Sequence, residues 1–322
     1  MPNERLPVTI ISGFLGSGKT TLLNHLLANT SELRIAILVN EFGELGIDGD
    51  LIQARGQPVV ELSNGCVCCT INDDLYAAAS TILERRGDLN HIVVETTGLA
   101  DPLPVALTFR ETKLRESTRI DSIITLIDAE NFCPDIFRSD AATNQIMYGD
   151  ILVLNKIDLV SPNRLDELEM RLGVTKAGAR ILRSEHGRVD PRIILSVGAP
   201  ETLVEEGSLD HDVAGHRAAG KISRHDHVVS DRFISWSFET DRMFNPTRRH
   251  RFLNREIPAE VFRAKGIIRL ENSAASYIFH LCGQRVTFEP DLREVPRTSR
   301  LVFIGIGLDQ VELRDRLSAC LS

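Results

Sequence analysis

Gly13-Phe14-Leu15-Gly16-Ser17-Gly18-Lys19-Thr20 is the stretch that decides the fold of this chain. It fits the pattern G-x-x-x-x-G-K-[ST] of a phosphate-binding P-loop. The apolar, β-branched stretch Val8–Ile11 precedes it and predicts a buried strand, and leucines at helical spacing follow it. A glycine-rich turn that binds nothing is the alternative. The strand before the loop and the helix after it make a P-loop the better interpretation.

A P-loop gives each of its residues a defined part in holding a nucleotide. Glycines let the main chain wrap around a triphosphate, so that N–H groups and the N-terminus of the following helix meet its negative charge. Lys19 is expected to reach the β- and γ-phosphates and to take part in catalysis, and Thr20 to place its hydroxyl on Mg²⁺. The predicted phosphate-binding residues are Gly13, Gly16, Ser17, Gly18, Lys19, Thr20 and Thr21.

The composition indicates a folded protein of two domains. The chain has 322 residues, of which 43% are hydrophobic, so a sizeable core is possible. Its formal net charge of −8 argues against nucleic acid and against an anionic membrane as partners. Met1–Arg5 lacks the apolar run of a signal peptide, and no apolar stretch approaches the roughly 20 residues of a membrane span. We therefore expect a cytoplasmic protein, a monomer or a weak homodimer.

Apolar runs alternate with helical patterns over residues 1–198. Several runs are hydrophobic without alternation, as expected of parallel strands that are covered on both faces. One helix carries apolar side chains on a single stripe from Leu75 to Leu83. This alternation predicts a doubly wound, mainly parallel α/β sheet, whose ligands bind beyond the carboxyl ends of the strands. The predicted strands are Val8–Ser12, Ile35–Asn40, Pro58–Leu62, His91–Glu95, Ser122–Ile127, Ile151–Leu154 and Arg192–Ser196.

The periodic pattern is lost over residues 199–232, which we interpret as a linker rich in Gly, Asp, Glu, Ser and His. A smaller α+β domain is predicted for residues 233–322, with an antiparallel sheet and helices on one face. Its predicted strands are Phe233–Phe238, Val261–Leu270, Tyr277–Phe288 and Arg300–Leu308, and its predicted helices are Pro246–Arg255 and Gln310–Leu321.

Asn155-Lys156-Ile157-Asp158 indicates which nucleotide the P-loop holds. The stretch directly follows a predicted strand and has the form N-K-x-D, the guanine-reading motif of GTPases. The Asp158 carboxylate can accept hydrogen bonds from both N1–H and the N2 amino group of guanine, whereas adenine offers no such pair of donors. A polar turn after a strand is the alternative. Because the motif follows a P-loop in an α/β pattern, GTP is the better prediction, with Asn155, Lys156 and Asp158 as nucleotide-binding residues.

Two further strand ends carry acidic residues that suit hydrolysis. Most P-loop proteins have an Asp acting on Mg²⁺ at the end of the strand His91–Glu95, and Glu95 stands there in this chain. Gly98 follows three residues later, where a main-chain N–H can meet the γ-phosphate. Glu41 and Asp48, after the second strand, are assigned provisional catalytic roles near the γ-phosphate, Mg²⁺ or the attacking water. Solvated acidic groups are the alternative for all three carboxylates.

Cys66, Cys68 and Cys69 crowd into one tight loop with the pattern C-x-C-C. A disulfide framework is not expected in the cytoplasm, and thiolates select soft or borderline ions such as Zn²⁺, Co²⁺ or Cu(I). Three sulfurs leave a tetrahedral ion one ligand short, and Glu41, a histidine, water or a partner could complete it. Buried thiols and a strained redox pair are the alternatives. The scattered Cys133, Cys282 and Cys320 are interpreted as ordinary buried thiols.

Taken together, the motifs G-F-L-G-S-G-K-T, N-E-F-G-E, N-G-C-V-C-C, E-T-T-G and N-K-I-D resemble, in that order, the CobW-like metal-chaperone GTPases. The resemblance covers nearly the whole chain. It implies a P-loop GTPase domain followed by a CobW carboxy-terminal domain. It also implies that Cys66, Cys68 and Cys69 bind zinc or cobalt, and that Glu95 is the glutamate which the family carries instead of Asp. The linker departs from the histidine-rich members of the family because it lacks a dense histidine tract.

The leading hypothesis is a slow GTPase whose nucleotide state gates delivery of a metal to a client protein, with GTP or GDP, Mg²⁺ and Zn²⁺ (or Co²⁺) as its ligands. A P-loop kinase or ligase acting on a small molecule is one alternative, and Asn155 and Asp158 argue against it. A nucleotide-binding scaffold with a purely structural zinc ion is the other.

Overall fold

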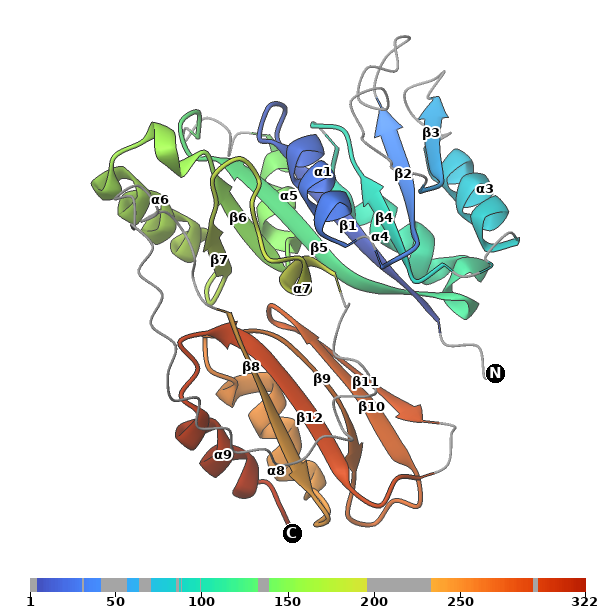
Figure 1. Ribbon diagram of the computed structural model, residues 1–322, viewed down its shortest axis with the longest axis vertical. Coiled ribbons are helices and arrows are strands. Elements are labelled where there is room, and N and C mark those ends of the chain that lie inside the picture. The colour runs from blue at the N-terminus through green and yellow to red at the C-terminus, as the bar shows by residue number, and fades with distance from the viewer. Residues whose placement is uncertain are drawn as a thin grey trace, which may run out of the picture.

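Two β-sheets form the framework of the computed structural model, which describes residues 5–30, 32–41, 57–63, 71–84, 87, 89–98, 100–132, 139–195, 233–291 and 295–322. The predicted linker, residues 199–232, lies outside the described residues. Figure 1 shows the first sheet at the top of the molecule and the second at the bottom. Among the described residues, no helix combines the length and the apolar composition needed to cross a lipid bilayer.

The first sheet confirms the predicted doubly wound architecture. Its strands all pair in parallel, in the order β3-β2-β4-β1-β5-β6-β7. β1 lies near the middle and ends at Gly13, so the P-loop emerges between the two halves of the sheet. The strands are β1 (Leu6–Gly13), β2 (Ile35–Glu41), β3 (Val59–Ser63), β4 (His91–Glu95), β5 (Thr118–Asp128), β6 (Ile151–Asn155) and β7 (Arg180–Arg183).

Helices cover both faces of this sheet. In Figure 1, α1 and α7 lie in front of the sheet, and α4 and α5 lie behind it. Alternate side chains of each strand point to opposite faces, so Ile11 and Val93 pack with α1, whereas Ile10 and Val94 pack with α3 and α4. The helices are α1 (Lys19–Asn29), α3 (Ile71–Glu84), α4 (Pro102–Glu111), α5 (Asp140–Tyr148), α6 (Pro162–Thr175) and α7 (Pro191–Ile194), with short 3₁₀ turns η1 (Lys113–Glu116) and η3 (Ile157–Leu159).

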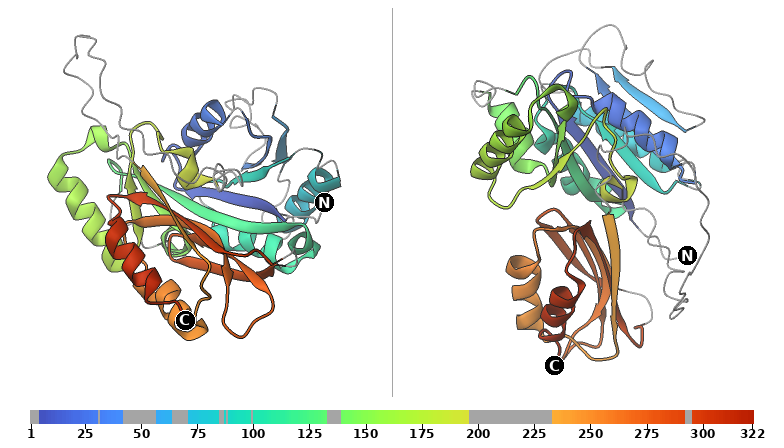
Figure 2. Two further views of the ribbon diagram at one scale, coloured as in Figure 1. Left: turned by 60° about the horizontal axis from the view of Figure 1, so that its bottom comes forward. Right: turned by 60° about the vertical axis from the view of Figure 1, so that its left-hand side comes forward.

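The second sheet is antiparallel throughout, as predicted, in the order β11-β10-β9-β12-β8. Figure 2 shows its helices together on one side. Phe252 and Leu317 from those helices are buried against Trp236, Phe279 and Phe303 of the strands. The elements are β8 (Phe233–Thr240), α8 (Pro246–Arg251), the π-helical turn η5 (Phe252–Glu256), β9 (Val261–Arg269), β10 (Ser276–Cys282), β11 (Arg285–Asp291), β12 (Ser299–Ile306) and α9 (Gln310–Ser318).

Two predicted strands were wrong, and one strand was missed. The expected strand Arg192–Ser196 is the helix α7 over its first residues, because Asp190 caps its N-terminus by accepting from the Arg192 N–H and Pro191 occupies the first turn. The true last strand of the first sheet is β7, which the sequence analysis missed. The expected strand Tyr277–Phe288 is a hairpin of β10 and β11, because Gly283 adopts a left-handed conformation and turns the chain.

Two arginines of the second domain form ion pairs with carboxylates of the first. Arg263 on β9 pairs with Asp121 on β5, with 2.6 Å between Nη2 and Oδ2. Arg285 on β11 pairs with Asp150, just before β6, also at 2.6 Å. Both contacts lie at the amino ends of the parallel strands, so the second domain sits at the opposite end of the first sheet from the P-loop (Figure 1).

Candidate functional site

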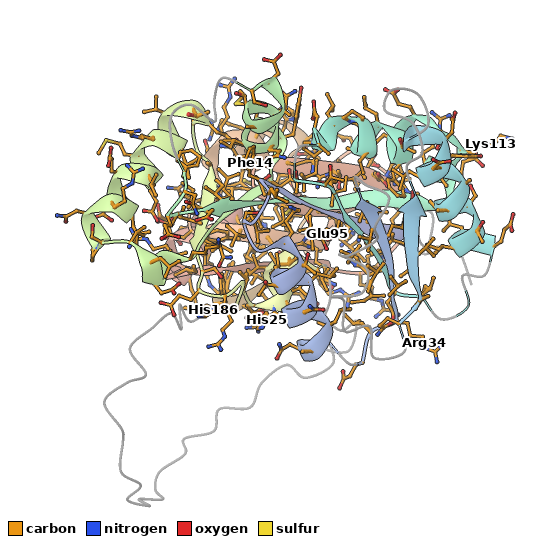
Figure 3. The ribbon with its side chains drawn as sticks, turned by 90° about the horizontal axis from the view of Figure 1, so that it is seen from above. Phe14, His25, Arg34, Glu95, Lys113 and His186 are labelled. Carbon is orange, nitrogen blue, oxygen red and sulfur yellow. The ribbon has the colours of Figure 1, made fainter. Side chains whose placement is uncertain are left out.

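The P-loop encloses its lysine. Lys19, in the first turn of α1, is buried, and its Nζ donates hydrogen bonds to the carbonyls of Gly13 at 3.1 Å and Phe14 at 3.3 Å. The ammonium is therefore held within the curve of the loop, where the sequence predicts the phosphates. Phe14 and Leu15 form the tip of the loop, and the Leu15 side chain is exposed. Figure 3 looks down on this edge of the sheet, with Phe14 and Glu95 labelled.

The two predicted magnesium residues lie side by side. Thr20 Oγ1 donates a hydrogen bond to Glu95 Oε1 at 2.8 Å, and Glu95 is buried at the end of β4. The main chain holds the pair in place, since the Thr96 N–H, next to Glu95, donates to the Ile11 carbonyl on β1 at 2.9 Å. A hydroxyl and a carboxylate oxygen are the ligands that Mg²⁺ prefers, so this donor set fits the ion that the sequence predicts.

Gly98 brings the loop after β4 against the tip of the P-loop. A Cβ on Gly98 would come within 2.5 Å of the Leu15 nitrogen, so only glycine permits this approach. Gln145 of α5 holds the same loop from behind, because its Nε2 donates to the Ala100 carbonyl at 3.0 Å and to that of Gly98 at 3.4 Å. A ligand at the γ-phosphate position would therefore meet two loops that already touch.

The side chain of Asn155 makes hydrogen bonds to two other loops of the protein. It is buried, its Nδ2 donates to the Ser17 carbonyl at 2.9 Å, and its Oδ1 accepts from the Gly187 N–H at 2.9 Å. Asn155 thus ties the P-loop to the loop after β7. Of the other predicted guanine-site residues, Asp158 is exposed on the turn η3.

Lys156 is held by a carboxylate from the neighbouring strand. It adopts a left-handed main-chain conformation, with φ of 63°, and its Nζ pairs with Asp128 Oδ2 at 2.7 Å. Burial alone would raise the pKa of Asp128, but hydrogen bonds from Asn131 and Lys156 outweigh it and lower that pKa. The carboxylate is therefore charged at neutral pH and fixes the lysine at the edge of the nucleotide site.

The loop Ser184–Arg188 belongs to the site, and the sequence analysis missed it. The Ser184 carbonyl accepts from the Ile157 N–H at 3.3 Å, and Gly187 donates to Asn155, so the loop lies against the guanine motif. A usable signal was present. Ser184 follows a short run with two adjacent apolar residues, Ile181 and Leu182, and the carboxyl end of any strand beside Asn155 is a position where ligands bind. The run was missed because it has only four residues, two of them arginines.

Several predicted site residues lie outside the described residues. These are Asp48, Cys66, Cys68 and Cys69, together with the side chain of Glu41 at the end of β2. Within the part of the chain that the structure describes, no three His, Cys, Asp or Glu side chains gather into a possible metal site. Cys282 and Cys320 are buried free thiols, as predicted, and burial raises the pKa of Cys282 to about 12, so it is inert.

Two family models together match most of the chain in sequence. Residues 7–183 match the CobW/HypB/UreG nucleotide-binding domain, and residues 233–321 match the cobalamin synthesis protein cobW C-terminal domain. The chain belongs to the CobW/HypB/UreG family. This membership confirms the predicted P-loop GTPase with a CobW carboxy-terminal domain.

Curated relatives match all or part of this CobW-type chain. The zinc chaperone CobW of Sinorhizobium sp is 30% identical, and the match spans 98% of this chain and 97% of that protein. Zinc-regulated GTPase metalloprotein activator 1 of Schizosaccharomyces pombe is 39% identical over 196 residues, 58% of this chain and 47% of that protein. A solved structure, Zn(II)-bound YjiA GTPase from E. coli, is 24% identical, covers 98% of this chain and 99% of its own, and has a TM-score of 0.48.

Proposed function

We propose that this CobW-type GTPase is a metallochaperone whose nucleotide state gates the binding and transfer of a transition metal. Cys66, Cys68 and Cys69 hold the metal, and a client protein receives it. Zinc is favoured over cobalt as the cargo, because full-length relatives are named zinc chaperones. The metal is the substrate of transfer here and not a resident cofactor.

The order of the strands is the observation that carries this proposal. β3 leads into the cysteine loop, and Cys66 follows its last residue, Ser63, by three positions. β2 lies between β3 and β4, with Glu41 beside Ser63 and Val39 beside Glu95. Neighbouring strands are about 4.8 Å apart, so the cysteine loop starts roughly 10 Å from the strand that carries Glu95. This placement supports a shared response to nucleotide and metal.

Thiolate chemistry favours transfer over storage. Three thiolates leave the fourth tetrahedral position of a zinc ion open, and an open position is where a client ligand can enter. If GTP tightens metal binding, the metal must tighten GTP binding by the same factor, because coupling free energies are reciprocal. A loop that the γ-phosphate moves is a suitable bistable element for this exchange.

Hydrolysis itself uses the groups gathered at the P-loop. Lys19 meets the β- and γ-phosphates, and Thr20 with Glu95 holds Mg²⁺, which neutralises charge that develops on the phosphate oxygens. Glu41 and Asp48 are the proposed residues near the attacking water. We expect a slow intrinsic rate. The amide of Gln145 is engaged by the carbonyls of Gly98 and Ala100, so this glutamine is not free to orient water.

Replacing Cys66, Cys68 and Cys69 together by Ser tests the proposal. The variant should lose tight zinc binding and metal-dependent changes in GTP hydrolysis, while its melting temperature and its affinity for GDP stay close to those of the parent. Cys320→Ser, in the other domain, is the control and should keep zinc. If the triple variant unfolds instead, zinc is structural and the scaffold alternative holds.

A further inference from the structure

One carbonyl on α7 accepts hydrogen bonds from both domains. The Ile194 carbonyl accepts hydrogen bonds from Ser122 Oγ at 3.0 Å, from Arg263 Nη2 at 3.1 Å and from Thr9 Oγ1 at 3.3 Å. Arg263 also donates from Nε to the preceding carbonyl, that of Ile193, at 2.5 Å. Arg263 of the carboxy-terminal domain therefore donates hydrogen bonds to two carbonyls of α7, the last described helix of the GTPase domain.

This turn is the lower end of a segment whose upper end lies at the nucleotide site. We call Ser184–Ile194 the base-side segment. In Figure 1 it runs from the carboxyl edge of the sheet, beside the P-loop, down to α7 at the opposite edge. At the top, the Gly187 N–H donates to Asn155 Oδ1, and Asn155 Nδ2 donates to the Ser17 carbonyl in the P-loop.

The middle of the base-side segment is packed against α1. A Cβ on Gly187 would come within 2.8 Å of the Leu22 nitrogen, so the two main chains are in direct contact. Val189 is buried in the core that α1 covers, and its carbonyl accepts from His25 Nε2 at 3.1 Å. The segment is therefore fixed along its length, and a displacement at α7 cannot be absorbed by a loose loop.

Arg263 is held firmly enough to act as an anchor. It is 5% exposed, and Asp121 pairs with it at 2.6 Å. Burial disfavours the charged guanidinium, but the nearby carboxylate outweighs this and raises the pKa of Arg263, so the anchor stays charged. The planar guanidinium of Arg263 donates hydrogen bonds to two carbonyls and one carboxylate at the same time, a geometry that a lysine cannot reproduce.

We infer that Arg263 is a positioning residue for the GTP site: it fixes the base-side segment, and the segment fixes Asn155 and the P-loop. The carboxy-terminal domain then takes part in holding the nucleotide although it lies at the far end of the sheet. By reciprocity, nucleotide binding stiffens the contact of the two domains. The inference rests on the GTP-binding site and is independent of the proposed metal chemistry.

Arg285 offers a matched control in the same interface. It pairs with Asp150 through Nη2 at 2.6 Å and Nε at 3.1 Å, and it donates to the carbonyls of Asp121 and Ile120. Its hydrogen bonds to the described residues all go to Asp150, Asp121 and Ile120, which lie outside the base-side segment. When either arginine is replaced, its carboxylate partner keeps another contact. Arg119 still pairs with Asp121, and the Ile123 N–H still donates to Asp150.

The test compares Arg263→Met with Arg285→Met in full-length protein that is free of zinc, with Mg²⁺ present. Dissociation constants for GDP, and kcat and KM for GTP, are measured for each. Arg263→Met should weaken GDP binding and raise KM about tenfold with kcat changed less than twofold, since coupling between sites of this kind is commonly 5- to 150-fold. Arg285→Met should change GDP affinity less than twofold. Equal GDP affinities in the two variants would overturn the inference.

Two further measurements separate positioning from a loss of stability. Arg263→Lys keeps the charge beside Asp121 but loses the second carbonyl contact, so it should restore the melting temperature without restoring GDP affinity. Hydrogen exchange at the Gly187 amide should quicken in Arg263→Met and not in Arg285→Met. Parental GDP affinity in Arg263→Lys, or unchanged hydrogen exchange at Gly187 in Arg263→Met, would show that Arg263 only stabilises the interface between the domains.

Discussion

The hydroxyl of Thr20 and the carboxylate of Glu95 lie 2.8 Å apart, although 75 residues separate them in the sequence. The contact joins the first turn of α1 to the end of β4, where a Mg²⁺-bound triphosphate is expected. Glu95→Gln removes the negative charge and keeps the shape. We predict that it keeps GDP affinity in EDTA and lowers Mg²⁺-dependent GTP hydrolysis roughly 100-fold, the scale of losing one preorganised electrostatic group.

Thr20 supplies the control for that experiment. Thr20→Ser retains the hydroxyl and should hydrolyse GTP within a few fold of the parent, whereas the isosteric Thr20→Val should resemble Glu95→Gln. Single-turnover hydrolysis with varied Mg²⁺ is the measurement. Full activity in Glu95→Gln would show that the carboxylate serves only to hold the hydroxyl.

Asp158 is the residue that we expect to select the base. Its carboxylate would accept two hydrogen bonds from guanine, whereas an amide in its place would present a donor to the N2 amino group. We predict that Asp158→Asn weakens GDP binding by at least about tenfold, because the charged acceptor is lost and the amide sets a donor against the guanine N2 amino group. The same variant should gain affinity for xanthosine diphosphate, whose C2 oxygen accepts from the new amide. Calorimetry with GDP, xanthosine diphosphate and ADP tests this, and unchanged preference for GDP would favour the kinase or ligase alternative.

Gly98→Ala tests the contact between the loop after β4 and the P-loop. The added methyl group would collide with the main chain of Leu15, and overpacking of this kind costs about 1–3 kcal/mol. We therefore expect a lower melting temperature and slower GTP hydrolysis. Gly173→Ala is the control, because a Cβ there meets nothing within 4 Å and lies in helix α6. That control should raise stability by about 0.5–1 kcal/mol.

A fully buried histidine makes stability depend on pH. Burial lowers the pKa of His91 to about 4, with the nearby Arg263 and Arg119 acting in the same direction and Asp121 opposing them. Above pH 6.5 both folded and unfolded chains hold His91 neutral. Between pH 6.5 and 4 only the unfolded chain takes up the proton, so the free energy of unfolding should fall with decreasing pH, by about 3 kcal/mol at pH 4 from this residue alone.

His91→Gln isolates that contribution. His91 Nε2 bonds with Thr9 Oγ1 at 2.9 Å, and a glutamine amide can replace this bond without titrating. His280, whose pKa is lowered to about 3 by burial and by Arg119, acts in the same direction in both proteins. Denaturant melts at pH 5 and pH 7.5 should therefore give a smaller difference for the variant. An identical difference in the two proteins would contradict the role of His91.

Much of the fold was readable from the sequence because it depends on local signals. The P-loop, the parallel strands and the antiparallel second sheet each follow from short-range patterns. The helix α7 was mistaken for a strand because its apolar Ile193 and Ile194 suit either structure. Asp190 and Pro191 just before them signal a helix start, and this signal outweighs the apolar run.

The contacts that organise the site were not readable in the same way. The motif identified Asn155 as a guanine-site residue, but its bonds to Ser17 and Gly187 depend on which strands become neighbours. The anchor Arg263 lies 142 residues from its partner Asp121. An arginine on a strand of alternating polarity predicts a solvated side chain, and only the docking of two domains buries it.

The most direct test of the metallochaperone account is the affinity of the protein for zinc in two nucleotide states. Zinc is titrated into protein loaded with GDP and into protein loaded with a non-hydrolysable GTP analogue, with Mg²⁺ present throughout. Gating by nucleotide predicts dissociation constants that differ by at least about fivefold, the lower end of typical coupling between two sites. Equal zinc affinities in the two states would contradict it.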